Sequence, residues 1–455
     1  MSASVGLLAV MRFGLGPKPG EIAALAGDPR AALLAMTERS EAALIRNPPI
    51  PDPYREMTVC YEWLAKRREL VRSGVNPQTL EGRKRIGPQC FRAAYDHECA
   101  ARFAHAVATD APLVERLVQF WSNHFSISAK KRNQIELLAG DYERTAIRPH
   151  VLGHFRDMLG AVVSHPAMLI YLDNQNSTGP NSPLGRNRQR GLNENLAREL
   201  LELHTLGADG GYFQEDVTNV SRILTGWSTT PRGHERPQAF RFVERQHEPG
   251  TWTVLGRAFP DEGQAQGEAV LDMLAAHSAT ARNVARRITR HFVAESPPPA
   301  LVDKLEHVFR ETDGDLAELA RALVRSDEAW TQERVKLLPP YDFVIASLRA
   351  TGVETPDRGL TRVLDKLGQP VWAPPSPEGW PDEDGAWALP DALLERIDWA
   401  STLAKRVPPG PDASELAEAV LGPALDTHTR QMIARAESRE QGLVLLLMSS
   451  QMQRR

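Results

Sequence analysis

Two carboxylates spaced for acid–base chemistry or metal binding lie in residues 193–206, NENLARELLELHTL. At about 100° per residue, the leucines of this segment form one face of a helix, and Glu199 and Glu202 lie together on the opposite face. A site that contains carboxylates and a histidine can bind a divalent metal or act in general acid–base catalysis. The alternative is a solvated face with salt bridges through Arg198. The segment therefore indicates either a carboxylate-rich site between helices or an ordinary exposed surface.

The partner of these carboxylates must come from elsewhere in the chain. His204 lies about 160° from Glu202 around the predicted helix, so these two side chains cannot easily share a metal. We therefore expect His124 or Asp173, from other helices, to complete a site with Glu199 and Glu202. If an arginine such as Arg198 pairs with the acids instead, no metal is needed.

His124 ends an apolar stripe. Residues 113, 117, 120 and 121 are apolar and recur at helical spacing, and His124 continues the same face. Its side chain should therefore point into the core. An inward histidine is usually a hydrogen-bonded core residue, and the alternative is a functional one. The candidate ligands of a divalent metal are thus His124, Glu199 and Glu202.

Residues 173–192 are rich in Asn, Gly and Arg and predict a mobile loop. Arginines at every second position cannot share one helical face, so we expect them to be extended. They are either part of a flexible basic loop or a clamp for an anion beside the N-terminus of the next helix, which Asn193 should cap. The candidate ligand-binding residues are Arg186, Arg188, Arg190, Asn193, Asn195 and Arg198.

Composition narrows the class of protein. The chain has 455 residues and a formal net charge of −4, which argues against nucleic-acid binding. No apolar run approaches 18 residues, so no transmembrane segment is expected. The start of the chain lacks the features of a secretory signal, and as written the protein is expected in the cytoplasm. The three cysteines show no CxxC spacing and indicate no disulfide framework or zinc site, and Cys90 and Cys99 are expected to be small buried thiols on one helix.

Periodicity and caps predict a mainly α fold, one large compact multi-helix unit over residues 1–455. A small β-hairpin is expected as an insertion at 228–258, with strands near 240–242 and 251–255 and a turn at 246–250. The sequence contains no GxSxG, HExxH, Walker or dinucleotide-binding motif, which lowers the prior for the corresponding enzymes.

Several motifs resemble those of the bacterial family known as domain of unknown function 1800. They are N-E-N-x-A-R-E-x-x-E-L-H-T-L-G at 193–207, D-G-G-Y-x-Q-x-D-V at 209–217, T-G-W at 225–227, F-W-x-N-H-F at 120–125, and the loop L-G-Q to G-W at 367–380. The resemblance covers nearly the whole chain. It adds His247, which matches a motif of the form H-D-x-G with Glu248 in place of the acid, and it singles out Asp173. The tryptophans of the 367–387 region are expected to pack over a core, with lining a groove as the alternative.

The resemblance also implies a partner. Members of the family are often encoded beside proteins that resemble the alkaline-phosphatase superfamily, which implies a complex and export with that partner to the periplasm. Two functions follow as expectations: a metal-dependent or hydrolytic enzyme, or a non-catalytic helical partner or scaffold for the co-encoded protein. For the enzyme, the candidate catalytic residues are His124, Asp173, Glu199, Glu202 and His247.

Overall fold

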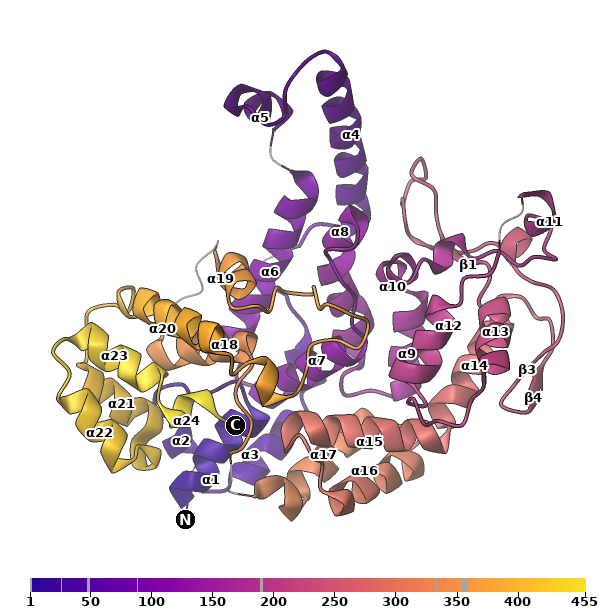
Figure 1. Ribbon diagram of the computed structural model, residues 1–455. Helices are drawn as coiled ribbons and strands as arrows, with labels where there is room; N and C mark the ends of the chain where they lie inside the picture. The colour runs from indigo at the N-terminus through magenta and orange to yellow at the C-terminus, as the bar shows by residue number, and fades with distance from the viewer. Residues whose placement is uncertain are drawn as a thin grey trace.

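The computed structural model describes residues 2–25, 27–46, 50–87, 89–188, 191–331, 334–353 and 359–455, without the side chains of residues 2–4, 187 and 188. As predicted, the fold is mainly α (Figure 1). The first helices are α1 (Ser2–Leu8), α2 (Glu21–Ala24), α3 (Pro29–Met36), α4 (Pro53–Arg72), α5 (Leu80–Ile86) and α6 (Cys90–Ala108). The central helices are α7 (Pro112–His124), α8 (Asn133–Tyr142), α9 (Phe155–Ser164), α10 (Pro166–Tyr171), α11 (Gly185–Arg188), α12 (Asn195–Glu199) and α13 (Gln214–Ile223).

The second half continues in the same way. Its helices are α14 (Gln264–Ala276), α15 (Ser278–Phe292), α16 (Pro299–Glu311), α17 (Leu316–Arg325), α18 (Pro340–Thr351), α19 (Leu360–Lys366), α20 (Pro390–Ala404), α21 (Ala413–Leu421), α22 (Thr427–Ala434), α23 (Arg439–Leu447) and α24 (Ser450–Gln453). Three described segments are π-helical: η1 (Ala9–Phe13), η3 (Glu143–Ile147) and η6 (Leu200–His204). The short 3₁₀ segments are η2 (Ser40–Ala43), η4 (Arg148–His150), η5 (Asn174–Asn176), η7 (Glu244–Gln246), η8 (Asp327–Trp330), η9 (Asp384–Ala386) and η10 (Gly422–Ala424). No helix of the described chain is long and apolar enough to cross a membrane.

Helix α7 lies in the core. Proline at its first position suits a residue whose N–H needs no helical partner. Leu113, Leu117 and Trp121, spaced by four, are each at most 1% exposed. The helix packs against α3, η1 and η3. The predicted stripe is thus confirmed, and His124 is buried at its end.

Four charged side chains are buried beside α7. Arg148 binds Glu115 (2.7 Å) and Glu143 (2.8 Å), and Arg102 also binds Glu143 (2.9 Å). None of the four side chains is more than 8% exposed. Burying a charge is costly unless it is paired and hydrogen-bonded, and here each charge has a partner of opposite sign. The network joins α6, α7, η3 and η4 at one place.

The predicted pairing of one hairpin is wrong, because the strands form two separate sheets. β1 (Trp227–Thr229) pairs antiparallel with β2 (Phe240–Phe242), and β3 (Trp252–Val254) pairs with β4 (Arg257–Phe259). Leu255 and Gly256, both at positive φ, make the two-residue turn between β3 and β4. The expected turn at 246–250 instead begins with buried residues that pack on the body.

The expectations that the cysteines form no disulfide and that Cys90 is a free buried thiol are wrong, whereas the expectation for Cys99 is confirmed. Cys60 and Cys90 form a disulfide with their Cα atoms 5.4 Å apart, whereas Cys99 is free and buried. The bond joins α4 to the first residue of α6, two helices that run side by side in an arm at the top of Figure 1. Spacing along the chain could not reveal the pair, because 30 residues separate the partners.

We expect the double substitution Cys60→Ser and Cys90→Ser to lower the free energy of unfolding by about 2–4 kcal/mol, because the bond closes a loop in the unfolded chain. Chemical denaturation of oxidised wild-type and variant proteins measures the difference. Cys99→Ser is the matched control, and an equal loss of stability in that variant would contradict the prediction.

Candidate functional site

The helix predicted over 193–206 is divided into two parts. Helix α12 ends at Glu199, and the chain continues as the wider π-helix η6 to His204. The Thr205 hydroxyl donates to the Leu200 carbonyl, five residues earlier, at 2.6 Å. The wider turn leaves His204 fully buried against Phe125, with ring centroids 5.2 Å apart.

Glu199 and Glu202 are both half-buried. Within the described chain, neither carboxylate makes a hydrogen bond or an ion pair. Burial and then the charge of Glu202 raise the pKa of Glu199. Arg198 instead pairs with Glu194 at 3.2 Å, and this predicted ion pair is confirmed. The two candidate acids thus lie close to each other, and neither is in an ion pair with a described cation.

His124 contacts the backbone of this helix rather than its carboxylates. Its Nε2 lies 3.1 Å from the His204 carbonyl oxygen, and its buried Nδ1 has no hydrogen-bond partner among the described residues. Burial holds its pKa well below the ordinary value. Among the residues that the structure describes, no three His, Cys, Asp or Glu side chains are grouped to hold a metal ion. His124, Glu199 and Glu202 therefore do not form the metal-binding group that the sequence suggested.

Asp173 lies with a left-handed backbone at the end of α10. Its carboxylate pairs with Lys131 at 2.8 Å and Arg132 at 2.5 Å. The Asn193 amide donates to the Asp173 carbonyl (3.3 Å), and its oxygen accepts the N–H of Asn195 (2.9 Å). The N-cap of α12 is Glu194, so the predicted cap Asn193 lies one residue earlier, where its side chain closes a turn onto Asn195. The Asp173 carboxylate is occupied by two cations.

The described part of the segment, residues 173–188, is not the extended loop that the arginine spacing suggested. Gly185–Arg188 is helical, and the Gly179 and Leu184 N–H groups donate to backbone carbonyls of Gln246 and Arg245. These contacts satisfy backbone groups that an extended loop would leave to water. Arg186 is exposed on α11. The Arg188 side chain and Arg190 lie outside the described residues, so the predicted clamp stays a prediction.

His247 is 5% exposed and packs beneath the sheets. Its Nδ1 lies 3.0 Å from the Thr225 carbonyl, and its Nε2 lies 3.5 Å from an Asp261 carboxylate oxygen. Neighbouring Glu248, also buried, accepts two hydrogen bonds from Asn181. The T-G-W motif and the histidine motif therefore contact each other. Neither Glu199 nor Glu202 takes part in these contacts.

A cleft lies elsewhere, and the sequence did not point to it as a site. Its walls come from α7, the end of α8, α15, the start of α18 and the segment 369–382. Trp372 and Trp380 line the cleft, which agrees with the alternative that these tryptophans line a groove. Trp387 is instead buried. Tyrosine, proline and tryptophan with a few polar groups are typical of a ligand-binding site.

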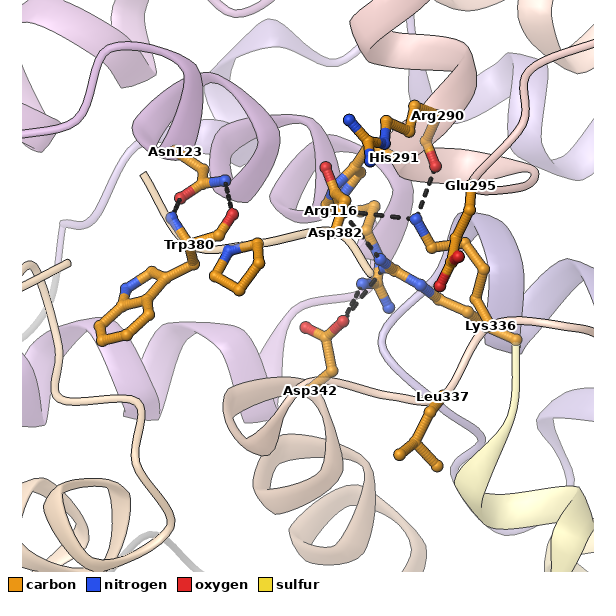
Figure 2. A network of polar contacts seen from close by, with 12 residues as sticks. Arg116, Asn123, Arg290, His291, Glu295, Lys336, Leu337, Asp342, Trp380 and Asp382 are labelled. Carbon is orange, nitrogen blue, oxygen red and sulfur yellow. Dashed lines mark hydrogen bonds and ion pairs between the residues drawn. The ribbon is translucent and has the colours of Figure 1, made fainter. Parts of the chain in front are cut away.

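The segment 371–380 is fixed by polar contacts to the helices. The Asn123 amide donates to the Trp380 carbonyl (3.0 Å) and accepts its N–H (2.7 Å), as Figure 2 shows. At Gly379, where φ is +95°, an added Cβ would lie 2.6 Å from the Asn123 carbonyl oxygen. Trp372 also has a positive φ, and its indole N–H donates to Glu143 at 2.8 Å. Such strained backbone is kept where surrounding contacts impose it.

An Asp–His pair lies in the cleft wall. His291 Nδ1 is 3.1 Å from Asp382 Oδ1, and the two residues come from α15 and the segment 369–382 (Figure 2). Burial lowers the pKa of His291 to about 4 despite the opposing effect of Asp382. The imidazole is therefore neutral near pH 7. Since Nδ1–H donates to the carboxylate, Nε2 carries the lone pair.

Among the residues that the structure describes, three polar atoms of the cleft residues are buried without a hydrogen-bond partner: His291 Nε2, Gln119 Nε2 and Tyr341 Oη. Buried polar atoms are nearly always paired, so unpaired ones need a reason. Arg102 stacks over the Tyr341 ring at 4.4 Å and holds it in place. The three atoms, one acceptor and two donors, belong to residues that line the same cleft.

A buried charge network holds Asp382. Its carboxylate lies 3.5 Å from Lys336 Nζ and 3.8 Å from Arg455, which also binds Asp342 at 3.1 Å. Arg116 binds Asp342 from α7 (Figure 2). Burial raises the pKa of Asp382, but His291, Lys336 and Arg455 more than reverse this effect, so the carboxylate is ionised.

The sequence contained one usable signal for this site. On α15, Val284, Ile288 and His291 recur at i, i+4 and i+7, so His291 continues a buried stripe as His124 does on α7. No such signal marks Asp382, which follows the loop motif in an irregular segment. Its role depends on contacts between residues 91 positions apart.

A family model described as "Protein of unknown function (DUF1800)" matches residues 8–454. No curated protein and no solved structure matches the chain.

We expect Glu202→Gln to change the free energy of unfolding by less than about 0.5 kcal/mol, because the carboxylate has no cation partner to lose. The pKa of Glu199 should fall, since a neighbouring charge is removed. Thermal melts and titration of Glu199 by NMR measure the two effects. If added zinc or manganese raises the melting temperature of the wild type and not of the variant, a metal binds here and the prediction fails.

Proposed function

The chain belongs to the family described as Protein of unknown function (DUF1800), and we propose that it is a hydrolytic enzyme that uses His291 as a general base. The reaction takes place in the cleft between α7, α15, α18 and the segment 369–382. The observation that carries the proposal is the Asp382–His291 pair, which lines the cleft and whose His291 Nε2 has no hydrogen-bond partner among the described residues.

Each member of the site has a distinct role in this proposal. Asp382 fixes the His291 ring and the tautomer with the lone pair on Nε2, and its charge stabilises the imidazolium that forms. Nε2 takes a proton from water as the water oxygen attacks the substrate, and it returns that proton to the leaving group. Tyr341 Oη and Gln119 Nε2 donate to the oxygen that gains negative charge. The two donors have no hydrogen-bond partner in the described part of the chain, so they lose none there when they bind it.

The charged side chains around the cleft are paired with one another. They therefore support a role in positioning the base rather than in binding a charged ligand. Glu143 is held by Arg102 and Arg148, and Asp342 by Arg116 and Arg455. Although burial raises the pKa of Glu143, the two arginines bring it to about 2, so this carboxylate stays ionised and paired. Charges that are fixed in this way do not have to rearrange during the reaction.

The disulfide supports a further part of the proposal, which is that the protein works in an oxidising compartment. Structural disulfides persist in the periplasm and outside cells, and are rare in the cytosol. The Cys60–Cys90 bond thus favours export, the alternative that the family resemblance raised, over the cytoplasm. A co-encoded alkaline-phosphatase-like partner is compatible with that location.

The alternative location for the activity is the helix with Glu199 and Glu202. In that alternative, a divalent metal is the cofactor. Its support is the pair of half-buried, unpaired carboxylates. An experiment can distinguish the two locations, because one conservative substitution removes the key side chain of each.

We expect His291→Gln to reduce hydrolysis by about 10²–10⁴-fold, the usual contribution of a positioned base, and Glu202→Gln to leave it unchanged. The measurement uses a panel of p-nitrophenyl esters, phosphates and glycosides, with thermal melts to show that both variants fold. Loss of activity in Glu202→Gln with full activity in His291→Gln would move the site to the 193–206 helix. A protein that hydrolyses none of the panel and binds its co-encoded neighbour would favour the scaffold function.

The pH profile provides an independent check. Protonation of Nε2 removes the base, so kcat/KM should be constant above about pH 5 and fall as the pH drops through about 4, where His291 titrates. An acidic limb near pH 6.5 would mean that the base is an ordinary solvated histidine and would contradict the assignment to His291.

A further inference from the structure

The arm formed by α4, α5 and the first part of α6 extends away from the body of the protein (Figure 1). At its base, α4 and α6 pack against α8, and the Cys60–Cys90 disulfide joins the two helices. Helix α5 packs on α4, where the Trp63 indole donates to the Ile86 carbonyl at 3.2 Å. These contacts hold the helices of the arm together, and its outer end is exposed.

The outer end of the arm is strongly basic. Residues 62–85 contain seven Lys and Arg and three Glu, a net charge of +4 in a chain of net −4. Six of the seven cations are exposed, Arg67 is half-buried, and none forms an ion pair within the described chain. We call these cations the basic tip: Lys66, Arg67, Arg68, Arg72, Arg83, Lys84 and Arg85.

The two halves of the basic tip lie next to each other. The bond from Trp63 to Ile86 places the cations of α4, which begin one turn after Trp63, beside those of α5, which directly precede Ile86. Large apolar side chains are exposed among them: Leu80 is 68% and Val71 is 41% exposed. Unpaired cations with exposed apolar groups on a projecting end are the features that bind an anionic lipid surface.

We propose that the basic tip docks the protein onto an anionic phospholipid bilayer. The cations would lie over the phosphate headgroups, and Leu80 and Val71 would enter the interface. The projecting shape supports a bilayer over a protein groove, because a flat surface can reach the end of a projection without contacting the body. This docking is independent of the chemistry in the cleft.

The test is co-sedimentation of the full, oxidised chain with vesicles of equal amounts of phosphatidylcholine and phosphatidylglycerol, and with vesicles of phosphatidylcholine alone. We expect binding to the anionic vesicles that weakens at 0.5 M NaCl. Each basic residue near such a surface contributes roughly fivefold to affinity, so the triple variant Lys66→Gln, Arg68→Gln and Lys84→Gln should bind at least about 100-fold more weakly.

The matched control removes three exposed, unpaired cations from other elements: Lys366→Gln, Lys405→Gln and Arg435→Gln. Its net charge equals that of the tip variant, so it should retain most of the binding. Equal losses in both triple variants, or equal binding to both kinds of vesicle, would overturn the proposal. Binding of the tip to duplex DNA or polyglutamate without binding to vesicles would also overturn it.

Discussion

Burial of opposite charges in the cleft wall is the constraint on which the candidate site depends. Asp342 and Asp382 lie among Arg116, Lys336 and Arg455, and these three cations are at most 2% exposed. Removing one partner from a buried pair usually costs about 3–5 kcal/mol, because the other charge is left unpaired. The network therefore holds together parts of the chain that lie far apart in sequence, and it fixes the carboxylate that orients His291.

Hydrogen bonds from neutral side chains explain why an irregular segment can form a wall of the cleft. Loops are usually mobile, but the backbone of residues 371–380 is held by side chains of Tyr95, Asn123 and Ser126. The segment then continues directly into Asp382. A general base works only when its ring is held within a fraction of an ångström of a productive position, and these contacts supply that rigidity.

The family motifs serve mainly to assemble the fold. His124 packs in the core, Asn123 holds the backbone of the G-W motif, and the T-G-W and histidine motifs meet through Thr225 and His247. The cleft lies where the F-W-x-N-H-F helix meets the L-G-Q loop. Motif residues thus surround the proposed site, while the acid–base pair itself comes from residues outside the quoted motifs.

What the sequence determined by itself was local. Apolar periodicity and caps predicted a mainly α fold, the buried stripe of α7 and the turn at Asn193, because those signals act between residues a few positions apart. Tertiary structure decided the rest. It joined Cys60 to Cys90, paired the strands into two sheets instead of one, and brought His291 to Asp382. Each of these depends on which distant segments meet, and spacing along the chain carries no record of that.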